Sequence, residues 1–220
     1  MSVAVLIPWG GDCTYRHRAL EWVTARYEEL GLPVVLGESP ERWNKGLAVA
    51  NGLERCSADV IVLADADVWC DGITNAIRAV EAGAPWSIPH LLVNRLSEQG
   101  TDALLAGEPW EGLPLDQRPY RGVQGGGIVV LPREVLASVQ IDPRFTHWGQ
   151  EDQSHALALY TLTGPAWRGD ADLIHLWHPP QPRLSRRRGS VEGWQHFHRY
   201  RKARNDPVAM RRLLEEINAD

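Results

Sequence analysis

Short apolar runs separated by longer mixed segments dominate the first third of the chain. The β-branched runs at 3–8, 33–37 and 59–65 end at proline, glycine or acidic residues, which is typical of buried parallel strands. Helices are predicted between them, over 14–30, where apolar residues recur at helical spacing, and over 44–55. Strands that alternate with helices in this way predict an α/β fold with a mainly parallel sheet.

The rest of the chain mixes regular elements with segments rich in proline and glycine. The irregular stretch over 107–124 predicts a loop that covers a site. Residues 190–218 predict helix that is broken near Pro207, because proline disrupts a helix interior. Helices are also expected over 71–82 and 151–164, and strands over 87–93, 125–132 and 171–177.

Composition favours one globular domain. With 220 residues, of which 44% are hydrophobic, the chain can bury a sizeable core. We expect an α/β domain over 1–182 and a basic helical extension over 183–220 packed on the same domain. That extension has ten Arg and Lys residues against five acidic ones, although the whole chain has a net charge of -5. Its run Arg186–Arg188 faces either phosphates or solvent.

The first residues, MSVAVLIPWGG, contain an apolar run but no basic leader. The run is far shorter than the roughly 20 residues of a membrane span, and it does not match a signal peptide. The expectation is therefore a soluble, cytoplasmic protein without a transmembrane segment.

An acidic pair, Asp65 and Asp67, follows the third predicted strand directly. Because side chains two positions apart on a strand share a face, both carboxylates are expected to point the same way. The carboxyl ends of strands are where open α/β sheets bind ligands. A divalent cation with oxygen ligands would offset the repulsion between the two charges. The alternative interpretation is an acidic strand end in a turn.

Two histidines, His175 and His178, stand at the end of the last predicted strand. Three-residue spacing can bring both imidazoles near one ion where the chain turns. Together with one or two aspartates they would suit Mn²⁺, or Mg²⁺ in its place. The alternative is that both rings pack against Trp177 and the prolines that follow.

Six segments of the chain, taken in order, resemble the GT-A glycosyltransferases. Within that family the likeness is to the branch of animal beta-galactosyltransferases, polypeptide N-acetylgalactosaminyltransferases and bacterial chondroitin-type synthases. The segments span most of residues 3–180 and are IPWGGDCTYRHRALEWV (7–23), WNKGLAVAN (43–51), DADV (65–68), GGGIVVLPREVL (125–136), HWGQEDQSHALAL (147–159) and HLWHPP (175–180).

The resemblance implies a GT-A (Rossmann-like) fold with a mixed, mainly parallel sheet flanked by helices. It also implies a hexosyl- or N-acetylhexosaminyltransferase whose donor is a nucleotide sugar, with UDP-sugar as the expected form. Asp67 and His178 would bind the metal, and His175 stands where the galactosyltransferases have methionine. Gln150 replaces a glycine of the WGGED segment. The residues implied to bind the nucleotide sugar are Pro8, Trp9, Arg16, Arg18, Lys45, Asp65, Ala66, Gly126 and Trp148.

The same resemblance supplies candidates for the chemistry of transfer. Asp152, at a helix start, would take the acceptor's proton, and helix-end donors are expected to lower its pKa. Glu151 would hold hydroxyls of the sugar or acceptor, and Trp148 would stack on a sugar face. A base at position 152 implies inversion of configuration, whereas the related N-acetylgalactosaminyltransferases retain it.

Several other functions share some of these features. A nucleotidyltransferase, a metal-dependent phosphohydrolase and an inactive sugar-binding module remain alternatives. The partner would be a nucleotide-sugar donor. The sequence leaves the acceptor open among a glycan, a protein, a small molecule and a modified nucleic acid.

Overall fold

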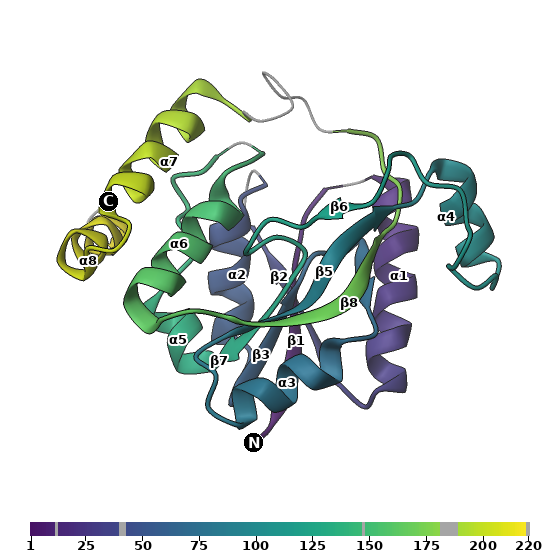
Figure 1. Cartoon of the computed structure of the whole chain (residues 1–220), viewed down its shortest axis with the longest axis horizontal. Coiled ribbons are helices and arrows are strands. Elements are labelled where there is room, and N and C mark those ends of the chain that lie inside the picture. Colours follow the sequence, from purple (N-terminus) through teal and green to yellow (C-terminus); the bar gives the residue numbers. More distant parts are fainter. Residues whose placement is uncertain (12, 40–42, 147, 181–188, 219–220) are drawn as a thin grey trace.

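The buried apolar strands pair into one twisted sheet (Figure 1). A computed structural model describes residues 1–11, 13–39, 43–146, 148–180 and 189–218. Within them the sheet has eight strands in the order β2-β1-β3-β7-β5-β8-β4, and β6 pairs with β5. The strands are β1 (Val3–Trp9), β2 (Val34–Glu38), β3 (Val60–Ala64), β4 (Val68–Cys70), β5 (Ser87–Arg95), β6 (Tyr120–Arg121), β7 (Ile128–Pro132) and β8 (Trp167–His175).

Helices cover both faces of this sheet because side chains alternate along each central strand. Leu6 and Ile61 belong to an apolar cluster with α2, α5 and α6, whereas Val5 and Val62 belong to a second cluster with α1 and α3. The helices are α1 (Thr14–Glu29), α2 (Lys45–Glu54), α3 (Ile73–Glu81), α4 (Glu98–Leu105), α5 (Arg133–Ser138), α6 (Glu151–Thr163), α7 (Val191–Ala203) and α8 (Pro207–Glu215), followed by a 3-10 turn, η1 (Glu216–Asn218).

The α/β class and the flanking helices are confirmed, but the sheet is less parallel than the sequence predicts. β1 pairs in parallel with β2 and β3, and β5 with β8, whereas β7, β4 and β6 make antiparallel contacts. The first βαβαβ unit is parallel throughout, whereas the later strands mix the parallel β5–β8 pair with antiparallel pairs. The second half reverses direction because its strands are joined through turns and long connections as well as through helices.

Some expected boundaries are shifted for local reasons. The strand predicted from residue 125 begins at Ile128, because Gly125 and Gly127 have φ values of 87° and 78°, outside the extended region. α4 lies just before the predicted loop, and its start is capped by Ser97. The helix α4 and the strand β6 are not among the predicted elements. Nor are β4 and α5, since three to six residues show little periodicity.

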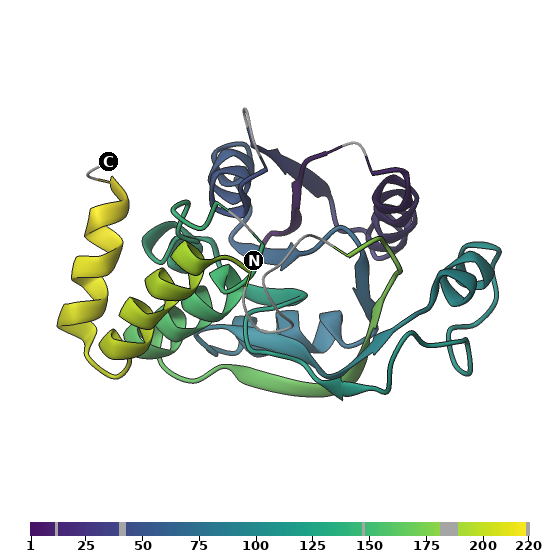
Figure 2. The same ribbon diagram turned by 90° about the horizontal axis from the view of Figure 1, so that it is seen from above.

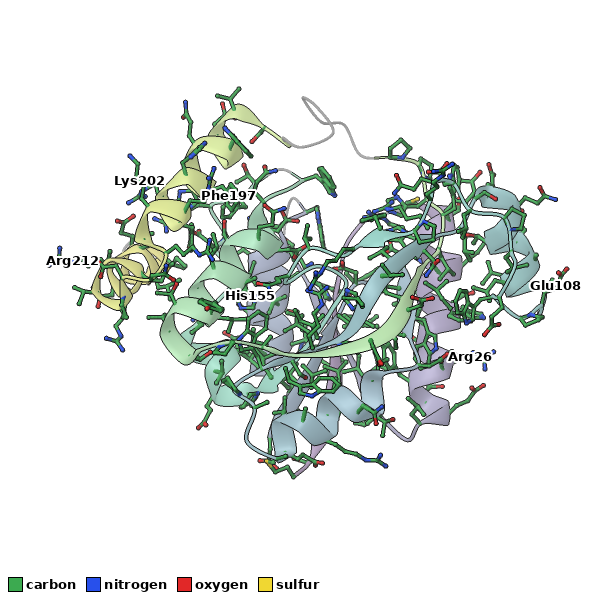
Figure 3. All side chains as sticks on the ribbon, viewed as in Figure 1. Arg26, Glu108, His155, Phe197, Lys202 and Arg212 are labelled. Carbon is green, nitrogen blue, oxygen red and sulfur yellow. The ribbon has the colours of Figure 1, made fainter. Side chains whose placement is uncertain are left out.

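The helices α7 and α8 share the core of the domain, and we call them the C-terminal helix pair. They lie beside α6 (Figure 2), and Phe197, Tyr200 and Met210 belong to the same apolar cluster as the sheet. Figure 3 shows Lys202 and Arg212 extending outward from the pair, whereas Phe197 lies on its inner side. The predicted break is confirmed, since Pro207 is the first residue of α8.

Two features of the sequence remain without a structural description. The expected boundary at 182 and the cluster Arg186–Arg188 lie outside the described residues. Among the helices that are described, none has the length and apolar character needed to cross a bilayer.

Replacing Met210 tests whether the C-terminal helix pair is part of the domain core. Met210 is fully buried, so Met210→Ala should lower the free energy of unfolding by about 2–5 kcal/mol in a single cooperative transition. Urea denaturation followed by circular dichroism measures this change. Val208→Ala, at a position 59% exposed on the same helix, should stay within about 0.5 kcal/mol. A separate early transition of the two helices, or no loss in Met210→Ala, would contradict the shared core.

Candidate metal and carboxylate site

A compact group of three metal-ligating side chains lies where β4 pairs with β8. Val68 stands opposite His175 in the antiparallel ladder, and the amide of Leu176 donates to the carbonyl of Asp67 over 2.8 Å. His178 Nε2 lies 3.3 Å from Asp67 Oδ2, and His175 Nε2 lies 3.9 Å from Oδ1 of the same carboxylate. One ligand atom from each residue lies within 4.8 Å of the other two. The three predicted metal ligands therefore meet.

Both histidines are held in the tautomer that metal binding requires. Nδ1 of His175 lies 2.8 Å from the carbonyl oxygen of Leu176, and Nδ1 of His178 lies 2.8 Å from that of Pro179. A carbonyl only accepts, so each Nδ1 carries a proton, which leaves Nε2, the nitrogen nearer to Asp67, as the atom that can bind a metal. Burial lowers the pKa of His175 to about 4, so this ring is neutral at pH 7. The donor set fits Mn²⁺ or another divalent ion.

Asp67 is buried but ionised. Burial alone would raise the pKa of this carboxyl, but His175, His178 and Arg16 outweigh the effect and hold it below its usual value. Since the ring of His175 is uncharged at neutral pH, Arg16 and Arg95 are the arginines whose positive charge persists there.

The structure separates the two arginines that the sequence leaves equivalent. Arg16 Nε lies 3.7 Å from Asp67 Oδ2 and is buried without a hydrogen-bond acceptor. Arg18 instead forms an exposed ion pair with Asp102 at 2.8 Å. Of these two arginines, Arg16 is therefore the one beside the three-residue metal group.

Beside the metal group, one lysine links two carboxylates that are far apart in the sequence. Lys45 Nζ donates to Asp65 Oδ1 over 2.6 Å and to Asp152 Oδ1 over 2.7 Å. Asn44 caps α2 by accepting from the amide of Leu47, which places Lys45 in the first turn. Burial opposes the charge on Lys45, but Asp152 and Asp65 overcome it and raise its pKa above the ordinary value.

The expectation that the two carboxylates of the DAD sequence point the same way is wrong. Asp65 bonds to Lys45, whereas Asp67 faces the two histidines. Residues 65–67 lie in the turn between β3 and β4, so the alternation of an extended strand does not continue through them.

Glu151 and Asp152 occupy the first turn of α6 and are both hard to ionise. Burial raises the pKa of Glu151, and the neighbouring charge of Asp152 adds to it. The pKa of Asp152 is also raised, because burial outweighs the pairing with Lys45, which corrects the predicted lowering. Glu151 Oε2 is buried without a partner. Glu151 is therefore the carboxyl of this group that most readily holds a proton at neutral pH.

The triple glycine packs against the start of α6. A Cβ at Gly125 would overlap the carbonyl oxygen of Asp152, and one at Gly126 would stand 3.7 Å from Asp152 Oδ2. The amide of Asp65 donates to the carbonyl of Gly127 over 2.9 Å. The glycines thus join the end of β3 to the start of α6, and Gly126 lies next to the predicted base.

The other predicted donor-binding residues lie around this site with differing exposure. Pro8 and Trp9 end β1, and Trp9 makes an edge contact with the ring of His17 at 4.8 Å. Ala66 is 7% exposed, which leaves its side chain little contact with a ligand. Trp148 is 37% exposed and lies three residues before Glu151, the first residue of α6.

Sequence reasoning missed two residues near the site. Arg95 stands opposite His175 across the β5–β8 ladder, and its Nε donates to Tyr120 Oη over 3.1 Å. His90 is buried in β5 with both ring nitrogens unpartnered, and burial lowers its pKa to about 4. A histidine inside the apolar run SIPHLLV was the available signal for the second of these residues.

Comparison with known proteins finds no matching family model and no matching curated protein. Among solved structures, the chain is similar to glucosyl-3-phosphoglycerate synthase from Mycobacterium tuberculosis with Mn²⁺ and UDP-glucose, at 16% identity and a TM-score of 0.47, over 96% of this chain and 78% of that one. The same enzyme with Mg²⁺ and UDP matches at 16% identity and a TM-score of 0.44, over 82% of this chain and 72% of that one. A structure described as a mycobacterial protein matches at 17% identity and a TM-score of 0.41, over 82% of this chain and 68% of that one. The functional argument therefore rests on the site itself.

Glu151→Gln tests the protonation of the buried carboxyl. Because the folded state raises the pKa of Glu151 above its ordinary value of 4.5, wild-type stability includes a contribution that is lost as the pH rises above that value. The glutamine variant lacks this titration, so its free energy of unfolding should fall less between about pH 5 and about pH 8. Urea denaturation at several pH values measures the difference.

A matched control for this pH series is Glu134→Gln, an exposed glutamate in the first turn of α5. Its stability should follow the wild-type dependence on pH. Equal slopes in Glu151→Gln and the wild type would show that Glu151 is ionised throughout this range.

Proposed function

We propose that this chain is a metal-dependent glycosyltransferase that moves a sugar from UDP to an acceptor hydroxyl with inversion of configuration. The observation that carries the proposal is that a candidate metal site and a candidate carboxylate base lie at the same edge of the sheet. Asp67, His175 and His178 offer a cation site, and Asp152 beside Lys45 offers a carboxylate base. Sugar transfer from a diphosphate needs both charge neutralisation at the leaving group and proton removal from the acceptor.

The donor diphosphate would bind against the three-residue metal group. Asp67, His178 and His175 would hold Mn²⁺ or Mg²⁺, which supplies positive charge to the departing diphosphate. Arg16 has a buried Nε without an acceptor only 3.7 Å from Asp67, so its guanidinium can bind an anion there. Pro8 and Trp9, at the end of β1, are assigned to the nucleoside by the family resemblance.

The acceptor would be activated at the start of α6. Lys45 favours the ionised form of Asp152, while burial raises the pKa of that carboxyl, which makes the carboxylate a stronger base. Glu151, when protonated, can donate a hydrogen bond to a hydroxyl oxygen. Trp148, partly exposed just before this turn, can stack on a sugar face.

The direct test of the proposal is acceptor-dependent release of UDP. Purified protein with Mn²⁺ and a panel of UDP-sugars should release UDP faster when the correct hydroxyl acceptor is added, with the glycosylated product found by mass spectrometry. Release of phosphate from nucleotides without any acceptor product would favour a phosphohydrolase instead.

Asp67→Ala should weaken Mn²⁺-dependent UDP binding by about 10²-fold or more, because it removes the only carboxylate of the metal group in the described residues. Isothermal titration calorimetry with and without Mn²⁺ measures the effect. His178→Ala should weaken Mn²⁺-dependent UDP binding more than His175→Ala does, since His178 Nε2 is nearer to Asp67. Asp102→Ala, which breaks an exposed ion pair outside the group, is the control. UDP binding that keeps its Mn²⁺ dependence in Asp67→Ala would exclude this metal site.

Asp152→Asn keeps the shape of the side chain but removes its basicity. Turnover should fall by about 10²-fold or more while UDP-sugar affinity changes little. Steady-state kinetics give the turnover, and proton NMR of the product gives its anomeric configuration. Near-normal turnover in the variant, or a product that retains the donor's configuration, would remove Asp152 as the base.

A further inference from the structure

The connection between α5 and α6 leads directly into the turn that carries Glu151 and Asp152. Its described residues are 139–146 and 148–150, and we call them the α5–α6 connection. This segment lies against the C-terminal helix pair, and three separate contacts hold it in place.

The first contact is a buried carboxylate, Asp142, which is 3% exposed. Its Oδ2 accepts from Tyr200 Oη over 2.7 Å and lies 2.6 Å from His196 Nε2, and both of these residues belong to α7. Arg144 donates to both carboxylate oxygens of Asp142. Burial opposes ionisation, but the hydrogen bonds from His196, Arg144 and Tyr200 hold the pKa of Asp142 well below its usual range. A charge that is satisfied this fully fixes the geometry of the groups around it.

Arg144 extends the same contact to the end of the C-terminal helix pair. Its Nη1 donates to Glu216 Oε2 over 2.8 Å, and its Nη2 donates to the carbonyl of Leu213 over 2.9 Å. The connection is therefore bonded to α7, α8 and η1 together.

The second contact joins the residue before the N-cap of α7 to the residues immediately before the first turn of α6. A Cβ at Gly189 would overlap the carbonyl oxygen of Trp148, so the two backbones touch. The amide of Gly189 also donates to Gln150 Oε1 over 3.3 Å. Gln150 has a φ of 74°, which an L-residue adopts only where its surroundings hold it.

The third contact reaches the other side of the site. Asn44 Nδ2 donates to the carbonyl of Pro143 over 2.6 Å while its Oδ1 caps α2. The next residue is Lys45, which binds Asp152. The α5–α6 connection is thus bonded next to both members of the Lys45–Asp152 pair.

From these contacts we infer that Asp142 is a positioning residue and that the C-terminal helix pair sets the geometry of the Lys45–Asp152 pair. The role in turnover rests on the proposed glycosyl transfer. The metal group lies in the β3–β4 turn and at the end of β8, and none of its interactions among the described residues involves α7 or α8. The helix pair should therefore govern the chemical step and leave metal-dependent donor binding unchanged.

Tyr200→Phe tests this inference by removing one hydroxyl from Asp142. The turnover number should fall by about tenfold, while the donor KM and the Mn²⁺-dependent UDP affinity stay within about twofold. Amide hydrogen exchange over the α5–α6 connection and the first turn of α6 should become faster. Tyr160→Phe, the same change at a tyrosine 40% exposed on α6, should match the wild type in all of these measurements.

A second pair of variants separates positioning from general loss of structure. His196→Gln keeps an N–H that can reach Asp142 and should retain most of the turnover, whereas His196→Leu should lose it to the same extent as Tyr200→Phe. Unchanged turnover in Tyr200→Phe, a fall in donor affinity as large as the fall in turnover, or equal losses in the two His196 variants would each overturn the inference. Hydrogen exchange needs no turnover, so unchanged exchange in Tyr200→Phe refutes the positioning role even if wild-type protein transfers no sugar.

Discussion

The buried ion pairs of Lys45 with Asp65 and Asp152 are the interaction on which the site depends. They join the end of β3, in the parallel first half of the sheet, to the start of α6, which follows β7 in the mixed second half. Without the ammonium group, Asp65, Glu151 and Asp152 would share a poorly solvated space with no cation to offset their repulsion, and an unpaired buried charge costs several kcal/mol. The two halves of the domain are therefore held together by these ion pairs as well as by the apolar core.

The same arrangement separates two tasks within one site. The turn at residues 65–67 sends Asp65 toward Lys45 and Asp67 toward the histidines, because the chain reverses there to begin β4. Pairing of β4 with β8 then brings His175 next to Asp67. Under the proposed function, Asp67 would bind a cation and Asp65 would support the proton-accepting Asp152 through Lys45, on the side that contacts the C-terminal helix pair.

Local patterns were sufficient for part of this picture. The βαβαβ half and the broken helix before Pro207 follow from periodicity and helix-end residues, and the grouping of Asp67, His175 and His178 follows from motif order. The pairing of Lys45 with Asp152 could not be predicted in this way, because the two residues lie 107 positions apart and meet only through the tertiary fold. The raised pKa of Asp152 was also missed, since its burial depends on packing that a helix-start argument does not include.

The central claim is that Asp67, His175 and His178 bind the cation that carries the donor diphosphate. The most direct measurement is anomalous diffraction at the manganese edge from crystals grown with Mn²⁺ and UDP. The account predicts one anomalous peak within about 2.5 Å of Asp67 Oδ2 and His178 Nε2, with diphosphate oxygens completing the coordination. A peak at another group of residues, or UDP bound away from Asp67 and without manganese, would contradict it.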